Sequence, residues 1–328
     1  MIAVARNHHY VPQGYLAGFT DTGTRDGKLY VLDLSTGSTF RTRPRNVAAE
    51  RDFNRVEIDG RDPDFLEKSL GALMEDKATL AIRKIAQAQR FTGDDDFTYV
   101  INLLCLLVVR NPRARRSLAS ARRQSASIVC EMLVSDKKIW EHHNRKAREA
   151  GYVSGPEVSF ERMKAFINGG KYTIEVATHA LIRTELSVFD DILRCLGARV
   201  WSLLNAAPDA PDFITCDHPV TLVFKDPKSK GPIGVGLHQT ELVFPITARH
   251  AFLGVYENPL NPVVSVKPKG VAAMNTRVIS HSDRQLYSRE PVVTVLKNGE
   301  PTTFELRSNN PLHRTSSKRQ KSPPAAGR

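Results

Sequence analysis

The fold of this chain is limited most by the order in which helix and strand patterns occur along the sequence. Helical periodicity occupies the middle of the sequence, and strand patterns occupy the parts before and after it. Between Lys28 and Ile58 the apolar residues alternate around a turn at Ser35-Thr36-Gly37, which predicts a hairpin or small sheet. Helical periodicity dominates over residues 63–197, and strand patterns return over 198–307. This order predicts an α+β protein with a central helical layer flanked by N- and C-terminal β segments. Those two segments could form one mixed or antiparallel sheet.

Individual helices are also readable from the sequence. The longest apolar run, Phe97 to Val109, is too short to cross a bilayer as a helix, so it predicts a buried core helix. Pro112 should end or kink that helix, because the proline ring clashes with the preceding turn. Asn298-Gly299 between two alternating runs predicts a β-hairpin. Further helices are expected over residues 115–134, 159–168 and, as one longer helix, 174–196.

The net charge of +12 is unevenly placed along the 328 residues. Residues 307–328 hold six Lys and Arg and no Asp or Glu, which is half of the excess. Few apolar residues occur there, so we expect a disordered basic tail over 308–328 behind a single domain over 1–307, β-rich over 1–60. Such a tail can contact nucleic-acid phosphates, and solvated disorder is the simpler alternative.

We expect no secretory signal at the N-terminus, because the polar His8-His9 pair follows after only a few residues. We therefore expect a cytoplasmic location and no membrane partner. The four cysteines have neither CxxC nor zinc-finger spacing, so structural zinc is not expected. Cys216 stands beside Asp217, but a catalytic thiolate needs an activating positive neighbour and partial exposure.

The opening motif His8-His9-Tyr10-Val11-Pro12-Gln13 is one of two compact polar motifs. Neighbouring side chains of an extended segment point to opposite faces, and we take His9 as the inward-facing one. His9 could transfer protons or bind a metal, or be a structural histidine that fixes the N-terminus. The Gln13 amide could hold a substrate group or a neighbouring backbone group, and we favour the backbone.

The second polar motif is Thr215-Cys216-Asp217-His218-Pro219, which we expect to pack beside the first. Asp217 follows a short strand, so it could serve as a general base or a metal ligand. An aspartate before a turn equally often accepts backbone amides. No HExxH or comparable spacing is present, so a divalent metal is possible but not indicated, and any cofactor stays unknown.

Arg110 ends a mainly apolar run, so its guanidinium needs an acceptor close by. Glu67, Glu75 and Asp217 are the candidate carboxylates, and we expect a pair with Glu75 or another of them. Glu67 and Glu75 are eight residues apart, about 80° around a helix, so both could flank one groove. The alternatives are an internal salt-bridge network and an anion site at Arg110.

Arg110 also begins an arginine cluster with no acidic residue in it, which consists of Arg110, Arg113, Arg115, Arg116, Arg122 and Arg123. Its members Arg115 and Arg122 are seven residues apart, so on a helix they lie on nearly the same side and could form a phosphate-binding ridge. A solvated helix face is the alternative. Aromatic residues that could stack bases are not interleaved with these arginines, so nothing indicates sequence-specific nucleic-acid recognition.

Several short motifs along the chain resemble the bacterial domain of unknown function 4238. They run from the opening motif to Phe244-Pro245-Ile246 and Asn275, through Pro44-Arg45-Asn46-Val47, Glu67, Glu75, Arg110-Asn111-Pro112, Trp201 and the Asp217 motif. Two positions depart from the family pattern, Asn54 in place of tyrosine and His218 in place of asparagine. The resemblance implies a fold and a recurrent set of polar residues, with His8, His218 and Asn275 in supporting positions. It implies no reaction.

Two functional classes fit these residues. The first is a hydrolase acting on a phosphorylated or nucleic-acid substrate, with His9, Asp217 and Glu75 as catalytic groups and Arg110 holding the anion. The second is a non-catalytic nucleic-acid-binding or regulatory protein of a stress or defence module. Convergence of the polar groups on an open pocket favours the first, and their burial in mutually satisfied pairs favours the second.

Overall fold

A computed structural model describes residues 7–56, 62–70 and 74–306, without the side chains of Leu66, Glu67 and Leu70. The predicted tail over 308–328 lies outside these residues. The chain divides into two compact units. The single domain predicted over 1–307 stays a prediction. The main unit comprises residues 1–111 and 184–328, and the helical unit comprises residues 112–183. The division cuts the helical stretch predicted over 63–197.

The first sheet of the main unit contains strands from the N-terminal and the C-terminal parts of the chain. Its strands β2 (Leu29–Asp33) and β3 (Thr39–Thr42) form the hairpin predicted around Gly37. Strand β2 also pairs with β11 (Gln285–Ser288), which pairs with the short strand β6 (Thr215–Cys216). The order is β3-β2-β11-β6, antiparallel throughout. N- and C-terminal β segments therefore meet in this sheet, within the predicted α+β class.

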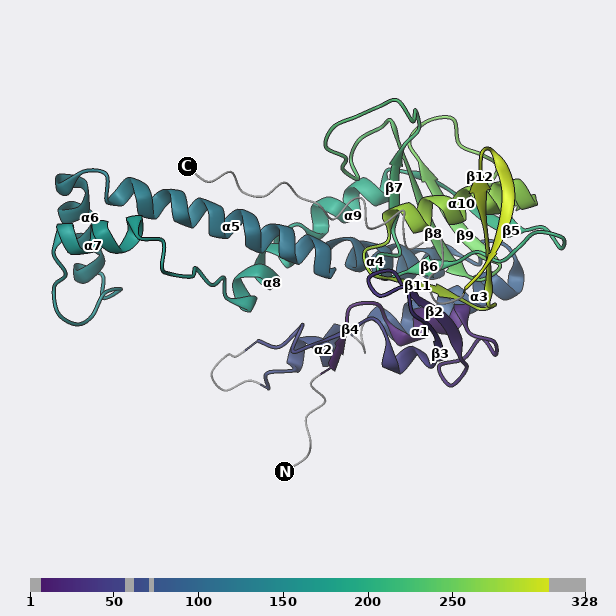
Figure 1. Cartoon of the computed structure of the whole chain (residues 1–328). Helices are drawn as coiled ribbons and strands as arrows, with labels where there is room; N and C mark the ends of the chain where they lie inside the picture. The colour runs from purple at the N-terminus through teal and green to yellow at the C-terminus, as the bar shows by residue number, and fades with distance from the viewer. Residues whose placement is uncertain (1–6, 57–61, 71–73, 307–328) are drawn as a thin grey trace. The chain divides into compact units, whose positions relative to one another are not determined.

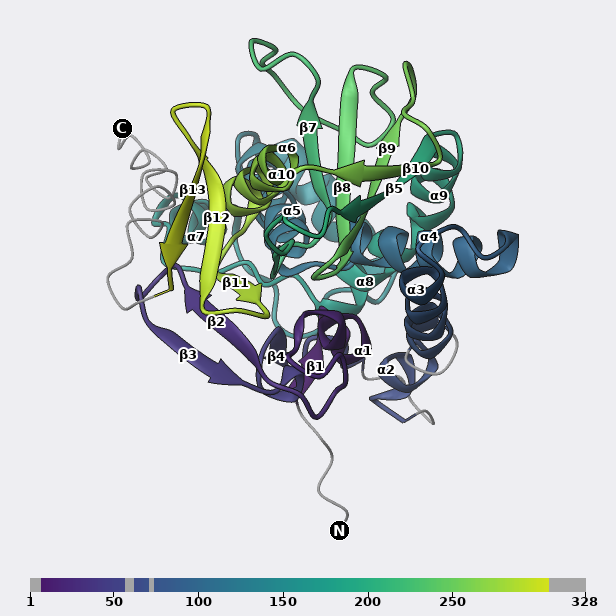
Figure 2. The ribbon, with the colours of Figure 1, turned by 90° about the vertical axis from the view of Figure 1, so that its right-hand side faces the viewer.

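A second, five-stranded sheet consists of C-terminal strands alone, in the order β10-β5-β9-β8-β7 (Figure 2). Of its described strand pairs, only β10 and β5 run parallel. The C-terminal β segment is therefore divided between two sheets, and the described residues form no single central sheet. The strands are β5 (Val200–Ala206), β7 (Thr221–Phe224), β8 (Thr240–Thr247), β9 (His250–Val255) and β10 (Val263–Val266).

Two small antiparallel pairs complete the β structure. The hairpin predicted at Asn298-Gly299 is confirmed as β12 (Val292–Lys297) and β13 (Glu300–Glu305). Both turn residues have left-handed backbone, φ 54° and 83°, which asparagine and glycine tolerate best. At the other end of the chain, β1 (Asn7–His9) pairs with β4 (Ala49–Arg51).

The core of the main unit is built around α4 (Asp94–Val109), the helix predicted from the apolar run. It packs against α3 (Asp76–Ala88) and α9 (Phe189–Gly197) (Figure 1). Aromatic side chains of the sheet and helices meet in this core, including Tyr15, Phe244 and Phe252. The remaining helices are α1 (Gln13–Leu16), α2 (Phe65–Leu70), α10 (Pro268–His281) and the 3-10 turns Ala17–Phe19 and Pro44–Asn46.

The helical unit contains α5 (Pro112–Leu133), α6 (Lys137–Glu149) and α7 (Phe160–Asn168), and α8 (Thr178–Ser187) crosses its boundary. The side chain of Asp136 caps α6 by accepting two backbone amides, and that of Ser159 caps α7 by accepting the amide of Arg162. All residues of α6 and α7 are described, and none of them is buried. These two helices therefore depend on their caps and on local contacts.

Several helices differ from the sequence predictions. The single helix predicted over 174–196 is two helices, α8 and α9, which break at Val188. Asp190 and Asp191 lie in the first turn of α9, where the helix dipole favours negative charge and so supports a new N-terminus. Helices α6 and α10 were not predicted. Helix α6 lies in a charged stretch that has few apolar residues at helical spacing. Helix α10 starts at Pro268, and proline is a favoured residue at the first position of a helix.

Candidate functional site

The inward histidine of the opening pair is His8, so the prediction that His9 faces inward is wrong. The side chains do lie on opposite sides of β1, but His8 is 2% exposed while His9 is partly buried. The backbone amide of Asn54 donates to Nδ1 of His8 at 2.9 Å. The ring proton is therefore on Nε2, which lies 3.4 Å from Oδ1 of the buried Asp64. No sequence pattern singled out Asp64, beyond its place after Asp62-Pro63.

His9 and Gln13 belong to one local arrangement at the start of α1. The amide Nε2 of Gln13 lies 3.5 Å from Nδ1 of His9, so its partner is a histidine ring rather than the predicted backbone group. The next residue, Gly14, lies so close to α3 that a Cβ atom at this position would be 2.2 Å from Oγ1 of Thr79. That hydroxyl donates to the carbonyl of Glu75 at 2.7 Å. Gln13 therefore lies beside the first turn of α3.

The predicted pairing of Arg110 with Glu75 is confirmed. Arg110 caps the C-terminus of α4 and is 4% exposed, and its Nη2 donates to Oε1 of Glu75 at 3.0 Å. The Glu75 side chain is 18% exposed. Glu67 lies in α2, but its side chain is outside the described residues. The contacts of Gly14 and Thr79 lead from the His9–Gln13 pair to the backbone carbonyl of Glu75, and the Glu75 side chain binds Arg110. We call His9, Gln13, Glu75 and Arg110 the α1–α3 polar group.

Asp217 acts as a backbone acceptor in the structure. Its two carboxylate oxygens accept the amides of Asp283 and Arg284 at 3.0 and 2.6 Å, which holds the connection between α10 and β11. Burial raises the pKa of Asp217 to about 6, although these amide bonds act in the opposite direction. The hydrogen bonds of Asp217 go to this connection and not to Glu75 or Arg110, so the three do not form one centre.

The opening motif does pack beside the Asp217 turn, as predicted. The hydroxyl of Tyr15 lies 2.7 Å from Oγ1 of Thr215 and donates to the carbonyl of Pro245 at 2.6 Å. Burial raises the pKa of Tyr10, and the nearby negative charge of Asp217 raises it further. The two motifs therefore pack side by side in the interior of the main unit. Their polar side chains nevertheless bind different partners.

The supporting residues His218 and Asn275 occupy structural positions. The ring of His218 meets that of His281 edge to face, with centroids 4.5 Å apart. Asn275 is fully buried; it accepts the amide of Ile214 at 3.0 Å. Its Nδ2 donates to the carbonyls of Asp212 and Thr294. These bonds fix α10 to β12 and to the segment that precedes β6.

The predicted arginine ridge belongs to the helical unit and is not uniformly exposed. Arg115 is buried, whereas Arg116, Arg122 and Arg123 are exposed on α5. This unit holds fourteen Lys and Arg against seven Asp and Glu, which gives it +7 of the chain's +12. Residues 307–328 carry +6, so the rest of the chain amounts to −1.

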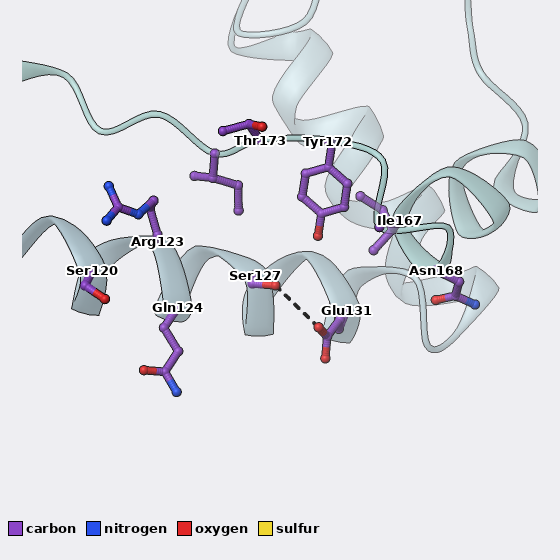
Figure 3. Close-up of a pocket in the computed structure, with 11 residues that line it drawn as sticks. Ser120, Arg123, Gln124, Ser127, Glu131, Ile167, Asn168, Tyr172 and Thr173 are labelled. Carbon is purple, nitrogen blue, oxygen red and sulfur yellow. Dashed lines mark hydrogen bonds between the residues drawn. The ribbon is translucent and has the colours of Figure 1, made fainter. Parts of the chain in front are cut away.

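A groove of about 970 Å³ lies within the helical unit, between α5 and residues 167–174 (Figure 3). Its lining includes Arg123, a member of the predicted arginine ridge, and Tyr172, which the sequence patterns did not single out. Within the ranges that the structure describes, no three His, Cys, Asp or Glu side chains are grouped closely enough to hold a metal ion. No described helix has the length and apolar character needed to span a membrane.

Comparison with known proteins identifies one family. The family model described as Protein of unknown function (DUF4238) matches residues 7–291. No curated protein and no solved structure matches the chain.

Proposed function

Since the chain belongs to the DUF4238 family of proteins of unknown function, its own residues have to suggest an activity, and we propose that it binds nucleic acid through the helical unit. The distribution of charge carries this proposal. The helical unit holds +7 in 72 residues, whereas the chain outside that unit and outside residues 307–328 is close to neutral. Concentrated positive charge attracts polyanions and releases counterions from a phosphate backbone.

The burial of the polar residues supports a binding role over a catalytic one. Arg110 is paired with Glu75, Asp217 has both oxygens bonded to amides, and the Asn275 side chain makes three hydrogen bonds. Groups committed to such contacts stabilise the fold, since leaving one unpaired in the interior is costly. They are therefore less available for a reaction.

The test is binding of fluorescently labelled RNA and DNA oligonucleotides, followed by anisotropy over a range of salt concentrations. The triple variant Arg116→Gln/Arg122→Gln/Arg123→Gln should weaken binding and lower the salt slope, by about one for each phosphate that is no longer neutralised. The matched control Arg83→Gln/Arg90→Gln/Lys230→Gln removes the same charge from exposed positions of the main unit. It should bind like the unmodified chain. Equal losses in both variants, or no binding by the unmodified chain, would refute the proposal.

A hydrolase remains the second candidate, because in the α1–α3 polar group the contacts of Gly14 and Thr79 lead from the His9–Gln13 pair to the backbone of Glu75, whose side chain binds Arg110. In this proposal His9 transfers a proton, Glu75 acts as a base, and Arg110 holds a phosphate that competes with Glu75 for the guanidinium. Asp217 takes no part, since its oxygens hold the α10–β11 connection.

This candidate is tested with phosphomonoesters and oligonucleotides, with and without added Mg²⁺ or Mn²⁺. His9→Ala should lower a hydrolytic rate by about 100-fold or more, the usual contribution of a positioned acid or base. His142→Ala is the control, because His142 is an exposed histidine of the helical unit. A rate that survives His9→Ala would exclude this mechanism.

A further inference from the structure

We infer that the groove of the helical unit is a binding site for an unpaired nucleobase. The inference deepens the proposed function and rests on it in part, because a single-stranded segment of nucleic acid is the expected source of the base. The groove lies between α5 and residues 167–174, and its volume of about 970 Å³ is ample for a base with its sugar (Figure 3).

An aromatic ring lines this groove. Tyr172 extends toward α5, near the Ser127–Glu131 pair (Figure 3). Phe166 stacks on Tyr172 with ring centroids 5.6 Å apart and an interplanar angle of 30°, and its own side chain is half exposed. A ring already supported by a second aromatic residue is a firm platform, and stacking on such rings is how proteins hold the bases of single strands.

The polar lining suits the edge of a base. Among the described residues, the side chains of Arg123, Gln124 and Asn168 make no hydrogen bond or ion pair within the protein. Amide side chains offer a donor and an acceptor together, as base edges do. Glu131 accepts a bond from Ser127 at 3.4 Å and keeps further acceptor capacity for an exocyclic amino group.

The charges of the residues that line the groove favour binding of the base of a nucleotide over binding of a phosphate alone. Arg123 is the one cation and Glu131 the one anion among the described residues that line the groove. A groove that is neutral in sum does not concentrate phosphate, but a neutral heterocycle fits it. The flanking phosphates of a strand could then contact Arg123 and the exposed arginines of α5. In a duplex the faces of the bases are stacked on one another and are not accessible to Tyr172. The groove should therefore bind single strands more tightly than duplexes.

The experiment compares binding of a single strand, its duplex and free adenosine or cytidine by the full chain. The oligonucleotides are followed by anisotropy and the nucleosides by NMR. Tyr172→Ala should weaken single-strand binding about five-fold or more, the loss expected from one stacked base. Tyr172→Phe should retain it. The control is Tyr152→Ala, which removes an exposed tyrosine of the same unit that does not line the groove.

Gln124→Ala is a second variant that leaves the aromatic pair in place, and it should weaken nucleoside binding. If single strand and duplex bind equally and neither variant changes binding, the inference is overturned while the proposed function stands. If no oligonucleotide binds but a nucleoside does, with loss in Tyr172→Ala, the groove is a nucleoside site and the proposed function falls. If nothing binds, both are overturned.

Discussion

Replacing Arg110 by methionine keeps much of the side-chain length while removing the charge of the buried ion pair. Arg110 is 4% exposed, and the Glu75 carboxylate that it binds at 3.0 Å is 18% exposed. Breaking a buried pair by removing one partner costs about 3–5 kcal/mol, because the other charge is left uncompensated. The partial exposure of Glu75 lets water screen its charge, so we expect about 3 kcal/mol, at the lower end of that range. For a unit of this size that corresponds to a fall in Tm of roughly 6–12 °C.

Thermal unfolding monitored by circular dichroism measures this loss, and Arg25→Met is the matched control. Arg25 binds Asp76, the residue after Glu75, but the two side chains are 49% and 66% exposed. An exposed pair of this kind contributes at most about 1 kcal/mol, so the control should melt nearly like the unmodified chain. The double variant Arg110→Met/Glu75→Gln should recover part of the stability, because no uncompensated charge remains.

Two outcomes would contradict this reasoning. If Arg110→Met and Arg25→Met shift Tm equally, burial of the pair is not what sets its strength. If Arg110→Met leaves Tm unchanged but abolishes binding of phosphate or a nucleotide, Arg110 is an anion site and the hydrolase candidate gains support.

Three further predictions concern pH, packing and the C-terminal residues. The folded-state pKa of Asp217 is raised from 3.8 to about 6, so Tm should rise as pH falls through 6 toward 4, and Asp217→Asn should flatten that dependence in calorimetry. Gly14→Ala should cost about 1–3 kcal/mol in urea unfolding because its Cβ meets Thr79, whereas Gly197→Ala has open space and should be neutral or slightly stabilising. Truncation after Ser308 should leave Tm unchanged but lower the salt slope of nucleic-acid binding, since it removes basic residues. A lowered Tm in the truncated chain would contradict the first half of that expectation.

Local patterns predicted those parts of the fold that depend on nearby residues. The run from Phe97 to Val109 and the turn at Asn298-Gly299 each carry their own signal, in burial and in backbone preference. The partner of Arg110 was predictable too, because a cation at the end of an apolar helix has few carboxylates within reach.

Contacts between distant segments were not predictable. The donors to Asp217 are backbone amides 66 and 67 residues away, and a backbone amide leaves no mark in a sequence. The choice of His8 over His9 depends on which side of β1 meets the core, where the amide of Asn54 and the side chain of Asp64 lie against His8. Periodicity alone also could not detect the break at Val188 or the division into two units.

Helices α6 and α7, all of whose residues are described, contain no buried residue, and for this reason the sequence of the helical unit can change more freely than that of the main unit. In the main unit, positions such as Gly14 and Asn275 are tied to close contacts that few other residues could make. Substitutions on α6 and α7 disturb no packed interior, so most of them should leave folding intact. The helical unit can therefore acquire a new ligand preference by changes of surface side chains alone.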